Sequence, residues 1–422
     1  MTGPYFELFV PPSQWHAREA VAASGVTLTF DDGSEAICGI SGLWNASLGY
    51  GNRAVADAVH RANLEAATLP IFRRGSVHAR RAAERLLDFA RPHDYASVLF
   101  STSGSAAVDA TVKLARHVQV VRGEVRRRRV VSLVGSYHGM TIGAMGLTGS
   151  DVRQDVYGAD TRLNLKVPHD DVVALGRVLD RFGPEIAAVV IEPVLGSGAL
   201  PVPHVTLERL VRGRAEHGYL LVADEVATGF HRTGPAFASH TWPTAPDLLI
   251  TSKALTNGTC AASAVLVARD VMAELAADDS VYWHGETQAG SPQHCAAIVA
   301  TLDEIARLDV PALVARQSVL LDEVLAGWAA LSPWFSTTGA GSMRALHVAP
   351  EAAASDPDLV ARTVRECLDA GAVVQPGPSC VQVLPAFTMT GAELRTYAER
   401  VGGVLARLAA SLPQPTERAS AA

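Results

Sequence analysis

Three ionisable residues stand at the ends of short apolar runs in the middle of this 422-residue chain. Glu192 follows residues 187–191, Asp224 follows residues 219–223, and Lys253 comes just after residues 248–251. A buried carboxylate can keep a heteroaromatic nitrogen protonated, and a desolvated lysine has a lowered pKa and can form a Schiff base. A single charged residue at a strand end is usually solvated, so these three positions gain meaning only together with their neighbours.

A loop of small residues follows another apolar run, at residues 97–100. Ser103, Gly104 and Ser105 open a helical pattern there. Free N–H groups and the helix dipole at such a start form a phosphate site. Serine also caps helices for structural reasons alone, so this stretch taken singly leaves both interpretations open.

An aromatic pair bracketed by glycines follows the apolar run at residues 130–134. Tyr137 and His138 lie between Gly135 and Gly139, which indicates a flat ligand with the backbone held close to it. The alternative is a turn in which Tyr137 only packs against its neighbours. For His138 the alternative is a structural hydrogen bond.

The apolar runs alternate with helical patterns, which predicts an α/β fold with a mostly parallel sheet covered on both faces. The predicted strands are residues 97–100, 130–134, 187–191, 219–223 and 248–251, and the predicted helices are residues 52–63, 106–118, 171–182 and 206–217. Ligands of such sheets bind at the carboxyl ends of the strands. The residues introduced above would therefore meet at one edge of the sheet.

The pattern changes after about residue 305. Helices are predicted over residues 311–331 and 393–412, with strands at 343–348 and 381–383, and the N-terminal strand pattern at 26–30 would join them in a smaller α+β domain. We therefore predict an N-terminal segment of the small domain (1–47), a large ligand-binding domain (48–305), a C-terminal small domain (306–412) and a disordered tail (413–422).

Composition excludes several classes of partner. The chain has 36 basic and 43 acidic residues and a formal charge of −7, which argues against nucleic acid and anionic membranes. Apolar stretches stay below the ~18 residues needed to cross a bilayer. Five cysteines are scattered singly, so we expect no metal site and no disulfide framework, and a cytoplasmic location.

The loops, the acid and the lysine together meet the needs of pyridoxal 5'-phosphate (PLP): a phosphate anchor, a stacking ring, a partner for the pyridine nitrogen and a lysine. The sequence resembles the class III aminotransferases of PLP fold type I over roughly residues 40–300. The stretches that match in order and spacing are Leu43-Trp44-Asn45, Gly49-Tyr50-Gly51, Thr102–Arg116, Tyr137-His138-Gly139, Ile191–Val194, Ala223–Gly234, Pro246-Asp247, Ser252-Lys253, His284–Thr287 and Gly290-Ser291-Pro292.

The resemblance implies a role for each matching residue. Lys253 matches the lysine that holds PLP as a Schiff base and later moves a proton, and Asp224 matches the acid that pairs with the pyridine nitrogen. Glu192 matches an acid near the cofactor that helps to shape the substrate side. These three are the predicted catalytic residues. Tyr137 matches the ring that stacks on the cofactor, and Val226 matches the residue on its other face.

The resemblance also implies how the phosphate is held. Ser103, Gly104 and Ser105 match the phosphate loop, and His138 matches a histidine close to the cofactor. Thr287 matches a threonine that reaches the phosphate from the neighbouring subunit, which implies a homodimer with shared active sites.

Two further residues of the stretch at 223–234 are predicted to be structural. Glu225 should point away from the site because successive strand residues alternate in direction. Arg232 should pair within its own loop.

Several polar residues of the family pattern are replaced here. Ala106 and Ala227 stand where the family has a glutamate and a glutamine. Many relatives hold the substrate's α-carboxylate with an arginine of the C-terminal domain, but residues 375–385 contain no basic residue. Either Arg73 or Arg74 does this work, or one substrate is an amine or ketone without the α-carboxylate.

The sequence thus predicts a PLP-dependent aminotransferase that moves an amino group from a small-molecule donor to a ketone or aldehyde by a ping-pong mechanism. The N-terminal phrase Phe6–Trp15 resembles aminotransferases of daptide-type ribosomal-peptide pathways, which implies a peptidyl ketone acceptor in natural-product biosynthesis. An epimerase, aminomutase or decarboxylase of the same fold remains open. A non-catalytic scaffold is the other alternative, motivated by Ala106 and Ala227 and opposed by the retained Lys253 and Asp224.

Overall fold

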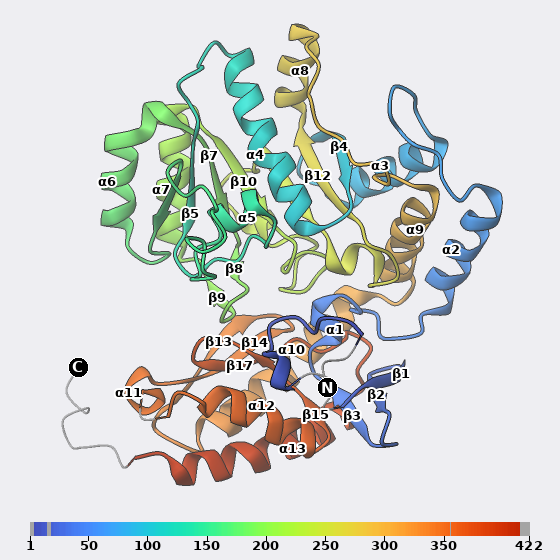
Figure 1. Cartoon of the computed structure of the whole chain (residues 1–422), viewed down its shortest axis with the longest axis vertical. Helices are drawn as coiled ribbons and strands as arrows, with labels where there is room; N and C mark the ends of the chain where they lie inside the picture. Colours follow the sequence, from blue (N-terminus) through green and yellow to red (C-terminus); the bar gives the residue numbers. More distant parts are fainter. Residues whose placement is uncertain (1–3, 15–17, 355, 414–422) are drawn as a thin grey trace.

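Figure 1 shows two bodies, one built on a central sheet and the other on the C-terminal third of the chain together with the N-terminal strands. The computed structural model describes residues 4–14, 18–354 and 356–413. The tail predicted to be disordered lies outside these ranges apart from Pro413, and so does Trp15 of the N-terminal phrase.

A seven-stranded sheet with the order β4-β12-β11-β10-β7-β5-β6 forms the centre of the upper body. Its strands are β4 (Tyr95–Ser101), β5 (Arg129–Leu133), β6 (Asn164–Val167), β7 (Ile186–Ile191), β10 (Leu220–Asp224), β11 (Leu248–Thr251) and β12 (Ser263–Ala268). The pairings among β6, β5, β7, β10 and β11 are parallel, and β12 is antiparallel to both its neighbours. The predicted mostly parallel α/β sheet is confirmed, with β6 and β12 as strands that were not predicted.

Helices cover both faces of this sheet because successive strand residues point to opposite sides. Leu220 and Val222 of β10 belong to the core under α4, whereas Leu221 and Ala223 belong to the core under α7. The helices of the upper body are α2 (Arg53–Glu65), α3 (Val77–Phe89), α4 (Gly104–Val121), α5 (Ile142–Leu147), α6 (Val172–Phe182), α7 (His204–His217), α8 (Arg269–Asp278) and α9 (Pro292–Arg307). The four helices predicted for this part of the chain correspond to α2, α4, α6 and α7.

The lower body contains two four-stranded sheets. One has the order β13-β14-β17-β16 and the other the order β1-β2-β3-β15. Their strands are β13 (Phe335–Ala340), β14 (Met343–Val348), β17 (Cys380–Val383), β16 (Gln375–Pro376), β1 (Ala20–Ser24), β2 (Thr27–Phe30), β3 (Glu35–Cys38) and β15 (Ala372–Val373). Because β3 pairs in parallel with β15, the two ends of the chain share one sheet. We retain 1–47, 48–305, 306–412 and 413–422 as a proposal for the domain limits.

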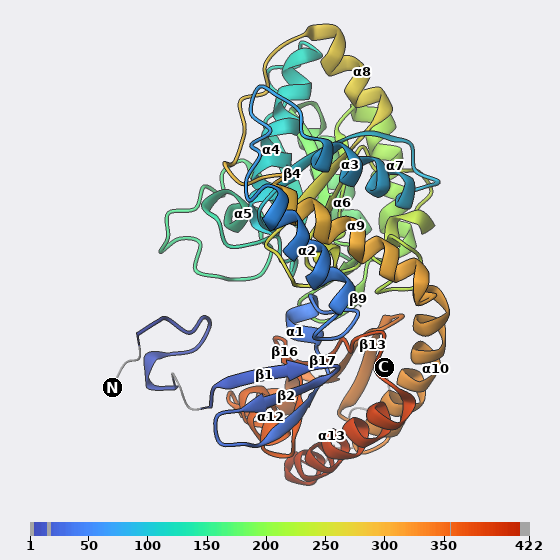
Figure 2. The same cartoon turned by 90° about the vertical axis from the view of Figure 1, so that its right-hand side faces the viewer.

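The remaining elements complete and join the two bodies. The lower body has the helices α10 (Val310–Ala329), α11 (Pro350–Ala353), α12 (Leu359–Asp369) and α13 (Gly391–Ser411). The two helices predicted after residue 305 correspond to α10 and α13. Figure 2 shows α10 following α9 and descending along the lower body. Short elements near the sheet are β8 (Val194–Leu195), β9 (Leu200–Pro201) and the 3-10 helices η2 (Gly183–Glu185), η3 (Ala238–Thr241) and η4 (Lys253–Thr256), with η1 (Pro12–Gln14) near the N-terminus. None of the helices in the described ranges combines the length and the apolar character needed to cross a membrane.

The element α1 (Ser41–Trp44) lies where the two bodies meet (Figures 1 and 2). All four of its residues have positive φ: 40° at Ser41, 58° at Gly42, 54° at Leu43 and 70° at Trp44. The segment is therefore a left-handed turn. Each of its non-glycine residues costs roughly 1–2 kcal/mol relative to ordinary helix geometry. Such strain persists only where the surroundings fix it, and it is concentrated at functional sites.

Candidate active site

The three predicted catalytic residues come together at one edge of the central sheet. β7, β10 and β11 are neighbouring parallel strands, so their carboxyl ends share this edge. The register pairs Ala223 with Ile191, the residue before Glu192, and pairs Asp224 with Ile250. The apolar strands thus supply a rigid frame that presents two acids and a lysine in one place.

Lys253 has the environment of a reactive amine. It begins η4 with a left-handed φ of 47°, and its Nζ lies 3.9 Å from the centroid of the Trp44 ring. Burial lowers the pKa of Lys253 to about 8; Glu192 and Asp224 act to raise that pKa, and Arg232 lowers it further. A lysine with this pKa has a substantial neutral, nucleophilic fraction in mildly basic solution.

Asp224 is buried and held by two hydrogen bonds. Its Oδ1 accepts from the backbone N–H of Val226 at 3.2 Å, and its Oδ2 lies 2.7 Å from Nδ1 of His138. Burial acts to lower the pKa of His138, but the hydrogen bond to Asp224 and the charges of Asp224 and Glu192 together outweigh it, so the pKa of His138 is raised. The contact with Asp224 therefore favours the protonated form of His138 in a buried place, where an isolated charge would be unfavourable.

Glu192 connects this centre to the aromatic loop. Its Oε2 accepts from the backbone N–H of Tyr137 at 2.8 Å, and its Oε1 accepts from the N–H of Gly196 at 3.0 Å. Burial raises the pKa of Glu192 to about 7, although His138 and the two N–H groups oppose the shift. The carboxyl group is therefore partly protonated near neutral pH, and it fixes the backbone that carries the half-exposed Tyr137 ring.

The predicted phosphate loop forms the start of α4. Ser103 is the N-cap, and its Oγ accepts from the N–H of Ala106 at 3.2 Å. This capping role was the structural alternative for Ser103, and it leaves the N–H groups of Gly104 and Ser105, at the first helical positions, without intrahelical acceptors. A side chain at Gly104 would place its Cβ 3.3 Å from Val226. Val226 therefore packs directly against the loop.

Glycine is required where the aromatic loop meets the phosphate loop. Gly139 has a φ of 126°, and a Cβ there would lie 2.1 Å from Oγ of Ser105. The Ser105 Oγ accepts from the N–H of Met140 at 3.1 Å. The two loops that the sequence singled out separately are thus in direct contact.

Thr287 lies on an exposed segment before α9. Glu286, its neighbour, contacts Ser101 and Thr102, which lead into the phosphate loop. A contact between Thr287 and a phosphate of a neighbouring subunit stays a prediction.

The prediction that Arg232 pairs within its own loop is wrong. Its side chain is buried and donates to the carbonyl oxygens of Ser342 (3.2 Å) and Pro385 (2.6 Å) and to the hydroxyls of Ser41 (3.2 Å) and Ser47 (2.9 Å). The guanidinium carries five N–H donors, and the acceptors it contacts all lie outside its own loop. Arg232 is structural, as predicted, but it joins distant segments.

Glu225 is structural, in line with the alternation argument. Its carboxylate accepts from Oγ1 of Thr228 (2.5 Å) and from the backbone N–H groups of Ala238 (3.1 Å) and Ser239 (2.6 Å). It therefore organises the loop after β10 on the side away from Asp224.

Sequence reasoning missed Trp44 as part of the site and the bond between His138 and Asp224. Trp44 reaches Lys253 only because α1 is a left-handed turn. Non-glycine residues such as Leu43 and Trp44 rarely adopt positive φ, so the sequence does not predict this turn. The bond from His138 could have been suspected from the shared edge, because β5 and β10 both neighbour β7.

The stretch without arginine contains the edge strand β16 and its inner neighbour β17 in the lower body. Gln375 begins β16 and is half-buried, and Gln382 of β17 is buried with Oε1 free of any hydrogen bond in the described structure. Arg73 and Arg74, the alternative carriers of a substrate carboxylate, are exposed in the loop between α2 and α3.

These residues fit PLP on structural grounds. The start of α4 offers N–H donors to a phosphate, and Gly104 and Gly139 let Val226 and the aromatic loop pack closely against that helix start. Asp224 has accepted two hydrogen bonds and, as a carboxylate, has capacity for more. Lys253 supplies an amine with a lowered pKa.

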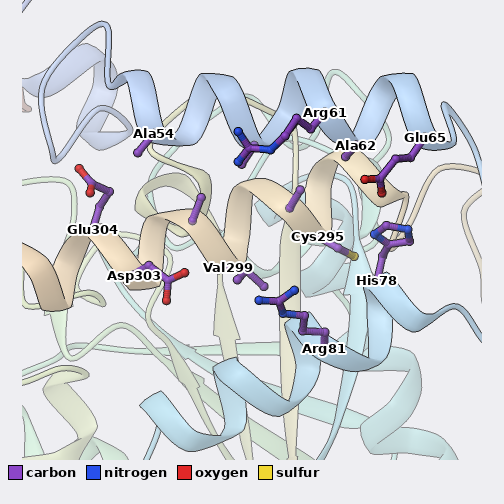
Figure 3. A pocket seen from close by; sticks show the side chains of 13 residues that line it. Ala54, Arg61, Ala62, Glu65, His78, Arg81, Cys295, Val299, Asp303 and Glu304 are labelled. Atoms are coloured by element: carbon purple, nitrogen blue, oxygen red, sulfur yellow. The ribbon is translucent and has the colours of Figure 1, made fainter.

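A cavity of about 370 Å³ lies elsewhere, between α2, α3 and α9 (Figure 3). Its lining includes Arg61, His78, Arg81 and Cys295 and none of the predicted site residues. The cavity is therefore separate from the edge of the sheet where Lys253 lies.

Comparison with known proteins agrees with this geometry. The family model for class-III aminotransferases matches residues 12–405. The chain is 29% identical to the adenosylmethionine-8-amino-7-oxononanoate aminotransferase of Nitratidesulfovibrio vulgaris, over 91% of this chain and 76% of that protein. It is 27% identical to the omega-amino acid–pyruvate aminotransferase of Pseudomonas putida, over 93% and 92% of the two chains.

A solved structure shows the same fold with the cofactor in place. The PLP-bound amine transaminase from an uncultivated Pseudomonas species superposes with a TM-score of 0.88 at 26% identity, over 96% of this chain and 99% of that one. The site geometry, the family match and these relatives agree on one cofactor and one type of reaction. The chain therefore belongs to the class-III aminotransferase family and is a PLP-dependent enzyme of fold type I.

Proposed function

We propose that the strand-end residues of this chain hold PLP and carry out amino-group transfer in two half-reactions. Lys253 would bind the cofactor covalently through Nζ, and Asp224 would face the pyridine nitrogen. The N–H groups of Gly104 and Ser105 would hold the phosphate. The observation that supports this most directly is the lysine of lowered pKa at the same sheet edge as a buried Asp224.

When bound, PLP withdraws electrons from the substrate's Cα and so makes its proton removable. Lys253, once released from the cofactor, is the base that takes this proton and returns it, because its pKa of about 8 lies near the pH at which a general base is efficient. His138 orients Asp224 through the 2.7 Å contact, so that the negative charge of a carboxylate there would face the ring nitrogen. That charge in turn favours a protonated ring nitrogen.

The walls of the site are aromatic and acidic. Tyr137 would stack on one face of the cofactor ring and Val226 would pack on the other. Glu192 lies on the substrate side, where its carboxyl group holds the Tyr137 backbone. Trp44 faces Nζ of Lys253, so it would form a flat wall for the substrate and exclude water from the amine.

The reaction we propose is a ping-pong transfer. A small-molecule amino donor gives its amino group to the enzyme and leaves as a carbonyl product, and a ketone or aldehyde acceptor then takes the amine. The absence of a basic residue at 375–385 supports an acceptor without an α-carboxylate. The proposal of a peptidyl ketone as acceptor is supported by the N-terminal resemblance alone. The proposal of a cytoplasmic location is supported by the five isolated cysteines.

The test combines spectra with turnover. Purified protein should absorb in the visible after PLP is added, lose that band when a donor is supplied alone, and recover it when an acceptor follows. Lys253→Ala should not form the band and should lose at least about a hundredfold in turnover. A parent protein that forms no visible band, or that forms it and exchanges no amino group with any donor, would rule out the proposal.

We also propose a homodimer with shared sites. Large apolar side chains are exposed together around the Thr287 segment: Phe72 is 51% exposed, Val281 62% and Trp283 83%. A Cβ built on Gly285 would lie 2.8 Å from the ring of Phe72, so these segments are adjacent. Contiguous exposed apolar surface of this kind favours burial against another subunit.

A further inference from the structure

The segment that carries Thr287 is bound along helix α4. We call residues 282–287 the strap. The hydroxyl of Tyr282 donates to the carbonyl oxygen of Ala110 at 2.6 Å, and Nζ of Lys113 donates to the carbonyl oxygen of Trp283 at 2.7 Å. Both contacts lie on α4, whose first residues form the phosphate loop. The strap therefore runs toward that loop and ends beside it.

The carboxylate of Glu286 makes the last contact of the strap. Its Oε2 accepts from the backbone N–H of Thr102 at 3.1 Å and from Oγ1 of the same residue, and its Oε1 accepts from Oγ of Ser101. The ring of His284 approaches the carboxylate only to 4.0 Å. Hydrogen bonds from three donors, rather than an ion pair, thus hold the charge of Glu286.

These three donors lie at the point where β4 turns into the phosphate loop. Ser101 is the last residue of β4, and Thr102 comes immediately before Ser103. On the other side, the carbonyl oxygen of Ser103 accepts from Oγ of Ser263 at 2.7 Å. The backbone that enters the loop is therefore fixed from two sides, by β12 and by the strap.

We propose that Glu286 is a positioning residue for the cofactor phosphate: it fixes the strand end at Ser101 and Thr102 and thereby sets the N–H groups of Gly104 and Ser105. The same bonds fix the backbone of Thr287, the next residue of the strap. This inference rests on the proposed placement of PLP at the start of α4.

The negative charge of Glu286 also acts against phosphate binding. A carboxylate close to a phosphate repels it, and removal of the charge would by itself strengthen phosphate binding. The three hydrogen bonds stabilise the charge of Glu286 where it lies, and a misplaced loop loses several N–H contacts at once. The positioning of the phosphate loop by Glu286 therefore outweighs the repulsion between its carboxylate and the phosphate. Loss of the Glu286 side chain should weaken phosphate binding.

The experiment compares a ligand with the phosphate and one without it. Apo-protein is titrated with PLP and, separately, with pyridoxal, and the visible absorbance of the lysine-bound ligand gives each Kd. The variants are Glu286→Ala, Glu286→Gln and Thr102→Val, with the exposed Glu351→Ala on α11 as the matched control. Thermal melting of each apo-protein reports the fold without any cofactor.

We expect Glu286→Ala to raise the Kd for PLP about tenfold or more while changing that for pyridoxal less than about threefold. Glu286→Gln keeps an oxygen acceptor and should recover part of the affinity, Thr102→Val should lie between, and Glu351→Ala should match the parent. Equal losses for PLP and pyridoxal would reduce Glu286 to a general structural role and overturn the inference, as would PLP binding by Glu286→Ala at parent strength or tighter. If Glu286→Ala melts early, Glu286→Gln and Thr102→Val decide by the same comparison. If the parent protein binds no PLP, the proposed function itself is overturned. If the parent binds PLP and the Glu286 variants bind it equally well, only the role of Glu286 is overturned.

Discussion

At the scale of single residues, the site is a balance among charges that are poorly solvated. Lys253 and Glu192 share one sheet edge with Asp224 and His138, and burial shifts Lys253 and Glu192 toward their neutral forms. The hydrogen bond to Asp224 and the nearby carboxylates favour the protonated form of His138 instead. The centre thus contains a short contact between His138 and Asp224 beside two groups whose pKa values lie near neutrality, as proton transfer requires.

The lowered pKa of Lys253 predicts how PLP uptake depends on pH. The amine must be neutral to attack, so the rate of PLP attachment to apo-protein should fall about tenfold per pH unit below pH 8 and level off above it. Stopped-flow absorbance between pH 6.5 and 9.5 measures this rate. In Glu192→Gln the midpoint should move lower, because Glu192 raises the pKa of Lys253. A rate that still climbs steeply at pH 9.5 would mean that the amine is not perturbed.

The raised pKa of Glu192 predicts a pH-dependent stability. The folded chain holds this proton more tightly than the unfolded chain does, so the unfolding free energy should decrease as pH rises from 4.5 to about 7. Glu192→Gln cannot ionise and should lack this component. Urea midpoints of parent and variant, measured in apo-protein across this window, should therefore separate in favour of the variant as pH increases. If the urea midpoints of parent and variant change with pH in parallel, the raised pKa of Glu192 is contradicted.

At the scale of elements, continuous apolar runs in the sequence predicted strands correctly, whereas irregular backbone such as the turn of α1 was not predicted. β7 and β10 are continuous apolar runs buried on both faces, so their period and length identified them. β12 is a buried apolar run of the same kind that was not predicted, and its residues do not reveal that it is antiparallel to both neighbours. The left-handed turn of α1 was missed because it contradicts the local preferences of Leu43 and Trp44. Tertiary contacts at the junction of the two bodies fix it instead.

The difference between local patterns and long-range contacts also explains which parts of the site could be predicted from the sequence. Motif spacing placed Lys253, Asp224 and Glu192 after strands, and neighbouring strands then brought them together. The long-range side-chain bonds of Arg232 had no local pattern, because their partners lie up to 191 residues away in the sequence. Spacing predicts which residues reach an edge of the sheet, whereas bonds between distant loops require the folded structure.

The contact between the two loops predicts a large cost for one extra methyl group. Gly139→Ala adds the strain of a φ of 126° to a Cβ that would lie 2.1 Å from Oγ of Ser105. We expect a loss of at least about 2 kcal/mol in the free energy of unfolding. Gly123→Ala is the control, since its φ of 79° is also positive but no atom lies within 4 Å of the built Cβ. Its loss should be nearer 1 kcal/mol. Equal losses in the two variants, measured by urea unfolding, would show that the loops do not press together.

At the scale of the whole molecule, the site depends on contacts between parts that are far apart in the sequence. Arg232 holds the left-handed turn and the lower body to the loop after β10 through neutral acceptors, and its guanidinium lies over the ring of Phe387 at 4.4 Å. Burial lowers the pKa of Arg232 to about 9. Because that turn carries Trp44 to Lys253, the wall of the site is positioned by the junction of the two bodies.

The proposed sharing of sites predicts complementation between two defective chains. If Thr287 serves the neighbouring subunit, a dimer of one Lys253→Ala chain and one Thr287→Ala chain has one site with both defects and one site with neither. Random mixing makes about half the dimers mixed, so about a quarter of all sites should regain full function. The two variants are denatured together and refolded, and transamination is measured with each refolded variant alone as control. Activity no greater than the mean of the two controls would show that Thr287 acts within its own chain, because a mixed dimer would then contain no intact site.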